Sequence, residues 1–289
     1  MSTLYHKIIK KSRKRPSPNH LQNTNFMLKY AIKKRTKKCD FMKRIPNLKL
    51  SDKEYYDLIN QAITRGGEGI ICPGSKPTTL FKIFIDYYGE SKPLSENKER
   101  KIIELYQLSL EDLVKPIRTI SYKGQLIGYE MSYDQLDIAL KDIILPRKEL
   151  ITVLKKSRES LLRLKEHDIT YGDVTEDNIL YNPKSKTIKF CDIDNIRLGN
   201  LPVDAKGFSL QKYYSLTGTM DEKADAFMHN ILTIKALSYD YSTYDTEILL
   251  DLKRGNYPSN FKQSAKPIFD SMNSPKLFNG EYIVQYIKR

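Results

Sequence analysis

Residues 171–180 read Tyr171-Gly-Asp-Val-Thr-Glu-Asp-Asn-Ile-Leu180, and the chain soon continues with Ile188-Lys-Phe-Cys-Asp-Ile-Asp194. The first stretch places Asp173 and Asn178 five positions apart in a predicted loop that follows a long helical pattern. The second is a short predicted strand that ends at another acid, Asp192. The two stretches therefore bring two carboxylates and an amide into one short part of the chain.

These two stretches resemble the protein-kinase-like superfamily. The first resembles the catalytic loop HRDxxxxN, and Asp192-Ile-Asp194 stands where that family has DFG. The resemblance implies that Asp173 accepts the proton of an attacking hydroxyl and orients it. It also implies that Asn178 and Asp192 are Mg²⁺ ligands and that ATP donates the phosphoryl group.

Features upstream follow in the order that this resemblance requires. Gly66-Gly-Glu-Gly69 lies between two predicted strands and resembles the glycine-rich loop, so the resemblance implies that Gly66, Gly67 and Gly69 bind ATP. Lys82 resembles the strand lysine that contacts the α- and β-phosphates.

The predicted helix 95–108 is expected to supply the glutamate that pairs with Lys82. We prefer Glu99, because Ile102 and Ile103 lie three and four positions further on and place it on the inward face; Glu96 is the alternative.

Two further segments complete the resemblance, which covers roughly residues 55–240. Tyr129-Glu-Met-Ser132 resembles the hinge whose backbone binds adenine, which implies that Glu130 and Ser132 bind ATP. The helical pattern that includes Asp225 resembles the helix whose leading Asp anchors the catalytic loop.

The sequence also departs from the kinase pattern. Tyr171 and Gly172 replace the His and Arg of HRD, Thr175 replaces a lysine common in Ser/Thr kinases, Asp194 replaces the glycine of DFG, and no APE is recognisable. The pattern Gly-Asp-x-x-x-x-Asn followed by Asp-x-Asp also resembles aminoglycoside- and choline-kinase-like phosphotransferases, which modify small molecules.

The expected function is ATP- and Mg²⁺-dependent phosphoryl transfer to a hydroxyl, as a serine/threonine-type protein kinase with a protein substrate. One alternative is a small-molecule phosphotransferase. Another is a pseudokinase that acts as a binding or scaffolding module. Retention of Lys82, Asp173, Asn178 and Asp192 argues against a pseudokinase, whereas the lost Arg, Lys and Gly positions argue for it.

The order of patterns predicts an α+β chain, because strands come early and helices late. The resemblance implies a two-lobed fold with a small β-rich N-lobe (about 50–131) and a helical C-lobe (about 132–289). Local signals agree: Ser51 and Glu54 form a predicted capping box, and Lys123-Gly124 joins two predicted strands.

The 289 residues carry a net charge of +14, and its location is uneven. Residues 1–49 hold 15 Lys and Arg against a single acid, Asp40, whereas residues 50–289 are neutral. We therefore expect a basic N-terminal extension (1–49) ahead of a kinase-like domain (50–289). The extension is either a solvated tail or a weak contact for polyanions such as nucleic acid or anionic membranes.

Composition argues against several other classes. Three cysteines without a CxxC pair argue against a disulfide framework or a cysteine-rich zinc site. No apolar run is long enough for a transmembrane segment, and the first residues have no secretory h-region. The expected location is cytoplasmic.

Overall fold

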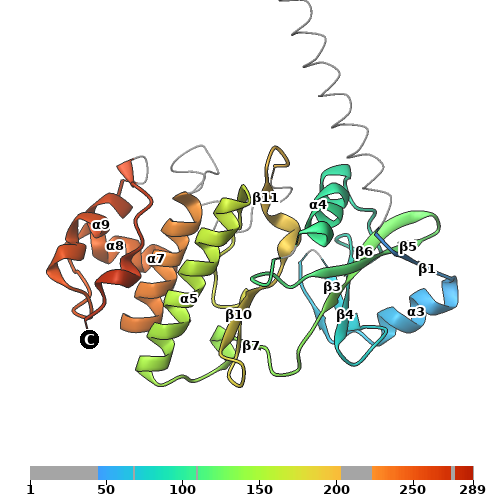
Figure 1. Ribbon diagram of the computed structural model, residues 1–289, viewed down its shortest axis with the longest axis horizontal. Helices are drawn as coiled ribbons and strands as arrows, with labels where there is room; N and C mark the ends of the chain where they lie inside the picture. The colour runs from blue at the N-terminus through green and yellow to red at the C-terminus, as the bar shows by residue number, and fades with distance from the viewer. Residues whose placement is uncertain (1–44, 68, 109, 203–222, 275–276, 289) are drawn as a thin grey trace, which may run out of the picture. The chain divides into compact units, whose positions relative to one another are not determined.

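The computed structural model describes residues 45–67, 69–108, 110–202, 223–274 and 277–288 (Figure 1). From Pro46 on, these residues belong to one compact unit. The unit combines a six-stranded sheet with α-helices, so this is a mixed protein of helices and strands, in agreement with the predicted α+β class.

The six-stranded sheet has the strand order β1-β5-β6-β4-β3-β2. β1 pairs in parallel with β5, and the other neighbours in this sheet are antiparallel. Lys123 and Gly124 join β5 to β6 with positive φ values of 48° and 79°, which confirms the predicted hairpin turn. The strands are Asn47–Leu50 (β1), Thr64–Arg65 (β2), Gly69–Pro73 (β3), Thr79–Phe84 (β4), Pro116–Tyr122 (β5) and Gln125–Ser132 (β6).

Helix α3 (Asp52–Asn60) packs beside this sheet. Its start is the predicted capping box: Glu54 N donates to Ser51 Oγ at 3.3 Å, and Ser51 N donates to Glu54 Oε2 at 2.8 Å. Tyr55 stacks on Tyr122 with ring centroids 4.1 Å apart. The other buried residues of this core are Leu58, Ile70, Cys72, Phe81, Ile83, Ile85, Ile120 and Ile127.

The compact unit begins at Pro46, four residues before the predicted start of the domain at residue 50. Asn47–Leu50 forms the edge strand β1, and Leu48 and Leu50 both pack against the core cluster. Alternate residues of a strand share one face, so this short segment buries its leucines while Lys49 stays exposed. Residues 1–44, on which the polyanion hypothesis rests, lie outside the described residues.

Two truncations test the role of β1. Deleting residues 1–45 should change the free energy of unfolding by less than about 0.5 kcal/mol. Deleting residues 1–50 removes Leu48 and Leu50 from the core and should cost about 2–3 kcal/mol. Urea unfolding of the two fragments measures the difference, and equal stabilities would contradict the structural role of β1.

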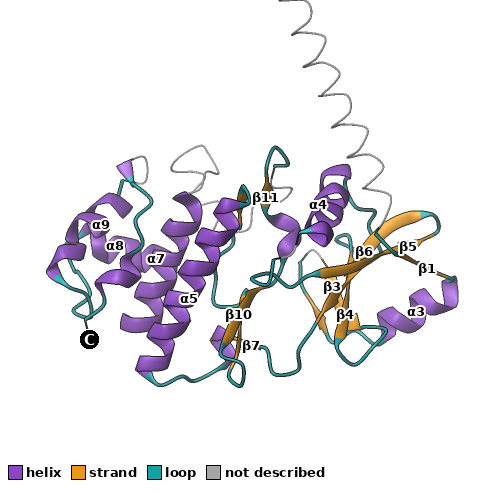
Figure 2. Cartoon of the chain, viewed as in Figure 1, coloured by secondary structure: helices purple, strands orange, loops and turns teal. Residues whose placement is uncertain are grey.

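Helix α4 lies between β4 and β5 in the sequence, and the helices α5, α7, α8 and α9 follow β6 (Figure 2). The predicted helix 95–108 is confirmed as α4, capped by Ser95, and the long helical pattern from residue 147 as α5. Two small sheets connect these helices to the rest: β7 (Ile138–Ala139) with β9 (Ile179–Asn182) and β10 (Thr187–Phe190), and β8 (Ile169–Thr170) with β11 (Arg197–Leu198). The helices are Glu96–Gln107 (α4), Arg147–Glu166 (α5), Lys223–Ser238 (α7), Asp245–Lys253 (α8) and Lys266–Met272 (α9).

Helix α7 forms the centre of the helical part. It is buried from Ala224 to Lys235 and contacts both α5 and α8. A helix that is buried on nearly every side belongs to a core, and this one therefore supports the residue at its start. None of the helices in the described ranges has the length and apolar character that a membrane span requires.

Candidate active site

The loop Tyr171–Asn178 is anchored by Asp225, in the first turn of α7. The Asp225 carboxylate accepts hydrogen bonds from the backbone N–H groups of Tyr171 at 2.9 Å and Gly172 at 2.7 Å. Gly172 has a φ of 80°, which favours glycine at this position. Burial raises the pKa of Asp225 to about 6, although the two backbone donors lower it. The predicted anchoring role of Asp225 is confirmed.

A second contact ties this loop to the end of β10. The Tyr171 side chain is buried, its ring lies 4.7 Å from that of Phe190, and its hydroxyl donates a hydrogen bond to the Cys191 carbonyl. Cys191 N in turn donates to the Asn178 carbonyl at 3.0 Å. The loop and the residues that precede Asp192 are therefore held as one unit.

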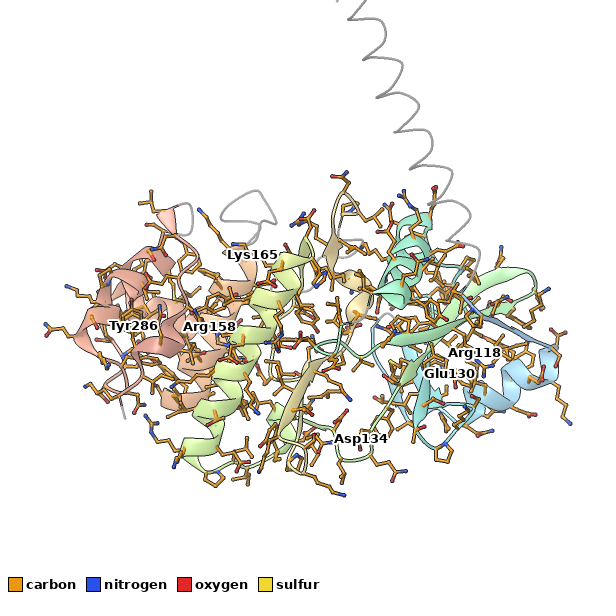
Figure 3. All side chains as sticks on the ribbon, in the orientation of Figure 1. Arg118, Glu130, Asp134, Arg158, Lys165 and Tyr286 are labelled. Atoms are coloured by element: carbon orange, nitrogen blue, oxygen red, sulfur yellow. The ribbon has the colours of Figure 1, made fainter. Side chains whose placement is uncertain are left out.

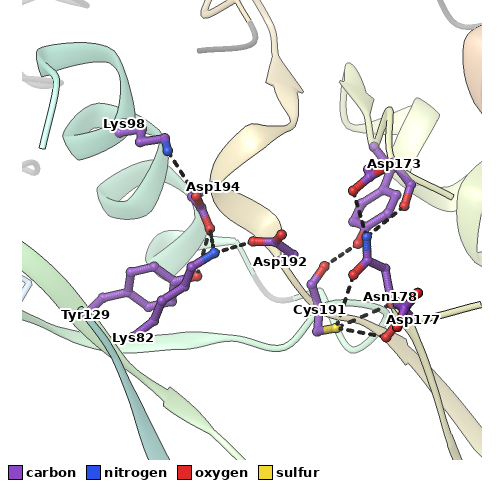
Figure 4. A network of polar contacts seen from close by, with 10 residues as sticks. Lys82, Lys98, Tyr129, Asp173, Asp177, Asn178, Cys191, Asp192 and Asp194 are labelled. Carbon is purple, nitrogen blue, oxygen red and sulfur yellow. Dashed lines mark hydrogen bonds and ion pairs between the residues drawn. The ribbon is translucent and has the colours of Figure 1, made fainter. Parts of the chain in front are cut away.

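Within this unit, Asp173 and Asn178 contact each other directly (Figure 4). Asn178 Nδ2 donates to Asp173 Oδ2 at 2.8 Å and to the Asp173 carbonyl at 3.1 Å. The amide Oδ1 of Asn178 faces the Cys191 thiol, whose Sγ is 4.0 Å away. The amide therefore orients the Asp173 carboxylate and keeps its own oxygen on the side of Cys191, which directly precedes Asp192.

The residues after Cys191 bring two carboxylates to Lys82, which comes from β4 (Figure 4). Lys82 Nζ donates to Asp194 Oδ1 at 2.5 Å and also forms an ion pair with Asp192. The Asp194 side chain has no exposed surface, whereas that of Asp192 is 36% exposed. Asp192 has left-handed backbone angles (φ 54°, ψ 52°), which are uncommon outside glycine and often occur at functional sites.

Burial and charge act against each other in this cluster. Burial lowers the pKa of Lys82, but the charges of Asp194 and Asp192 outweigh it and hold this pKa well above its ordinary value. For Asp194, burial raises the pKa, yet the neighbouring ammonium groups of Lys82 and Lys98 hold it below its ordinary value. Burial dominates at Asp192, whose pKa is raised. Asp194 is therefore the carboxylate that most firmly holds a negative charge.

The prediction that Glu99 is the partner of Lys82 is wrong in this structure. Asp192 and Asp194 supply the carboxylates that contact Lys82, although Glu99 does lie on α4 as predicted. Helix α4 instead contributes the opposite charge, since Lys98 Nζ lies 3.2 Å from Asp194 Oδ2.

The predicted hinge also needs correction. Strand β6 continues to Ser132, and Glu130 lies inside it, paired with Phe81 of β4 and with Arg118 of β5. Ser132 N donates to the Lys115 carbonyl at 3.0 Å. The backbone at Glu130 and Ser132 is therefore part of the sheet, and the chain leaves the sheet only after Ser132.

The buried side chain of Glu130 has a structural role. Its carboxylate accepts hydrogen bonds from Ser75 Oγ and Thr79 Oγ1, each at 2.6 Å, and from Arg118 Nε at 2.5 Å; Figure 3 labels Arg118 and Glu130. Burial raises the pKa of Glu130, but these hydrogen bonds outweigh it and lower the pKa. Glu130 fixes the turn between β3 and β4.

Gly66 and Gly67 follow β2, and Gly69 is the first residue of β3; Gly66 N donates to the Gly69 carbonyl at 2.8 Å. A Cβ added at Gly69 would lie 2.9 Å from the Ile83 carbonyl oxygen and 3.5 Å from Lys82 Cε. Gly69 therefore lies next to the Lys82 side chain, and it allows the close approach of two strands.

A pair of glycine variants tests this geometry. Gly69→Ala should cost about 1–3 kcal/mol of stability, because the new Cβ meets the backbone of β4. Gly67→Ala should change stability by less than about 0.5 kcal/mol, since no atom lies within 4 Å of its added Cβ. Thermal unfolding compares the two, and a Gly69→Ala protein as stable as Gly67→Ala would contradict the close approach.

Sequence reasoning missed two members of this cluster, Lys98 and the buried hydroxyl of Tyr129, which donates to Asp194 Oδ1 at 3.3 Å. It noted Asp194 only as a departure from DFG. The sequence did carry a signal: Asp194 is an acid between Ile193 and Ile196, and a carboxylate that becomes buried there requires a cationic partner.

Comparisons with protein-family models and with curated protein sequences found no match to this chain.

Proposed function

We propose that this protein transfers the γ-phosphoryl group of ATP to a hydroxyl of a protein substrate, with Mg²⁺ as cofactor. The observation that carries the proposal is the convergence of Lys82 with Asp192, which lie 110 positions apart in the sequence, next to the unit that contains Asp173 and Asn178. A strand lysine, a loop acid with an amide five positions later, and an acid after the next hairpin are the parts that phosphoryl transfer requires.

The order of elements supports a two-lobed, protein-kinase-like arrangement. A hairpin with glycines at its tip precedes the strand that carries Lys82, and helix α4 follows that strand. After the β5–β6 hairpin come the long helix α5, the loop with Asp173, and the hairpin β9–β10 that leads to Asp192. This is the order in which the superfamily resemblance arranges the same motifs.

The residues fit Mg²⁺ and a nucleotide. Among the described residues, no group of three His, Cys, Asp or Glu side chains is arranged to hold a metal. Mg²⁺ in kinase sites uses one or two protein oxygen ligands together with substrate phosphates, so Asp192 and the Oδ1 of Asn178 suffice. When bound, Mg²⁺ neutralises the charge that develops on the transferred group.

The chain's own residues have distinct tasks in this proposal. Lys82 binds phosphate oxygens with its ammonium group. Asp173, oriented by Asn178 Nδ2, holds the acceptor hydroxyl and takes its proton at a carboxylate oxygen. Asp225 and Tyr171 keep the loop in place. The tasks of Asp173, Asp225 and Tyr171 each use a contact that the folded chain already makes.

A small-molecule phosphotransferase is the second candidate. The observation that favours it is the second acid of Asp192-Ile-Asp194, which is buried against Lys82 and matches the Asp-x-Asp pattern of the aminoglycoside- and choline-kinase-like enzymes. A pseudokinase is the third candidate, because of the departures at Gly172 and Thr175.

One assay separates the three candidates. The protein is incubated with γ-³²P-ATP and Mg²⁺, with generic protein substrates in one set and an aminoglycoside and choline panel in the other. Label on protein supports the protein kinase, and label on a small molecule supports the second candidate. Mg·ATP binding without any transfer supports the pseudokinase and contradicts the proposed activity.

A further inference from the structure

Lys98, in the first turn of α4, makes a buried contact with Asp194. Its Nζ lies 3.2 Å from Asp194 Oδ2 and 4.5 Å from the centre of the Phe84 ring, and its side chain is only 11% exposed. The Asp194 side chain is completely buried. A lysine ammonium group is seldom buried to this extent unless it is paired, because removing its charge from water costs free energy.

The cluster contains two carboxylates and two ammonium groups. Lys82 contacts both Asp192 and Asp194, and Lys98 forms an ion pair with Asp194. Each Asp194 oxygen thus has its own lysine: Lys82 at Oδ1 and Lys98 at Oδ2. The charges balance within the cluster.

Nucleotide binding, as proposed above, changes this balance. Lys82 has to turn toward phosphate oxygens, and Asp192 has to turn toward the metal. Asp194 would then lose the ammonium group at its Oδ1. A buried carboxylate that loses its partner is strongly destabilised, so Asp194 would hold Lys82 back unless a second cation compensates its charge.

We propose that Lys98 is a positioning residue that neutralises Asp194 and so frees Lys82 to bind the nucleotide phosphates. The inference rests on the proposed function and adds a residue to it. In this arrangement helix α4 reaches the site through a lysine and Asp194, and Glu99 has no part in it. The contact with Phe84 holds the Lys98 ammonium against the strand that carries Lys82.

The test compares Lys98→Met with Glu99→Gln, its neighbour on the same helix, by isothermal titration with Mg·ATP. We expect Lys98→Met to weaken Mg·ATP binding at least about tenfold, which is about 1.4 kcal/mol. Glu99→Gln and Lys98→Arg should bind within about twofold of the wild type, since both keep the charge at Asp194 compensated. In turnover assays, the Lys98→Met defect should appear in KM for ATP much more than in kcat.

The double variant Lys98→Met/Asp194→Asn distinguishes charge compensation from packing. A neutral side chain at position 194 needs no cation, so the double variant should bind Mg·ATP more tightly than Lys98→Met. If Lys98→Met does not fold, Lys98→Gln replaces it, and the comparison is then between Lys98→Gln and Lys98→Gln/Asp194→Asn. A mere packing role for Lys98 predicts lower thermal stability in the single variants with no change in Mg·ATP affinity.

Two negative results have different meanings. If the wild type does not bind Mg·ATP, the proposed function is wrong. If the wild type binds and Lys98→Met binds equally well, or Glu99→Gln loses as much affinity as Lys98→Met, the positioning role of Lys98 is wrong while the proposed function stands.

Discussion

Replacing Asp173 with asparagine is expected to lower turnover at least ~100-fold while Mg·ATP binding stays close to that of the wild type. Asparagine keeps the shape of the side chain but cannot accept the hydroxyl proton. Asp173 contacts Asn178, whereas the ion pairs of Asp192 are with Lys82, so the nucleotide cluster should remain intact. Steady-state kinetics measure turnover, and isothermal titration measures binding.

Asp177→Asn is the matched control, because Asp177 lies in the same loop, its side chain is 54% exposed, and it pairs with Lys141 at the surface. Its turnover should stay within about twofold of the wild type, as expected for a surface substitution. Wild-type turnover in Asp173→Asn, or an equal loss in Asp177→Asn, would remove Asp173 from its proposed role.

Asp192→Ala is expected to act differently, because it removes a proposed metal ligand. Both turnover and Mg²⁺-dependent ATP binding should fall, each by at least about tenfold. Lys82→Met should also reduce both, since the phosphates lose their ammonium contact. Titrations with ATP in the presence and absence of Mg²⁺ identify the metal-dependent part of the loss.

A buried acid elsewhere provides the control for Asp192→Ala. Asp137 accepts a hydrogen bond from Lys189 Nζ at 3.0 Å and its side chain is only 4% exposed. Asp137→Ala should lower thermal stability but leave Mg·ATP affinity unchanged. Unchanged Mg·ATP affinity in both Asp192→Ala and Lys82→Met would mean that the nucleotide site lies elsewhere.

The elements that the sequence predicted well are those fixed by local signals. The hairpin at Lys123-Gly124 depends on two residues that accept positive φ. The start of α3 depends on a capping box between Ser51 and Glu54, which lie three positions apart. Lys82, Asp173, Asn178 and Asp192 were identified because their spacing matches a motif, and the structure brings them into neighbouring contacts.

The predictions that failed depend on contacts between distant segments. Which α4 residue faces Asp194 depends on the rotation of the helix, and Lys98 and Glu99 differ by only about 100° around its axis. β1 was missed because its pairing with β5 joins Asn47 to Thr119, a contact that no local pattern reveals. Strand β6 extends through the segment predicted to be a hinge because its end depends on the pairing of Ser132 with Thr79 of β4.

The thermal unfolding midpoint, measured with and without Mg·ATP, tests most directly the proposed claim that the Lys82 cluster binds Mg·ATP. At a nucleotide concentration of about 100 Kd, binding should stabilise the protein by about 2.7 kcal/mol, so Tm should rise by several degrees. ATP without Mg²⁺ should have a smaller effect, and Lys82→Met should show little or none. A wild-type Tm that Mg·ATP leaves unchanged at millimolar concentrations would contradict the claim.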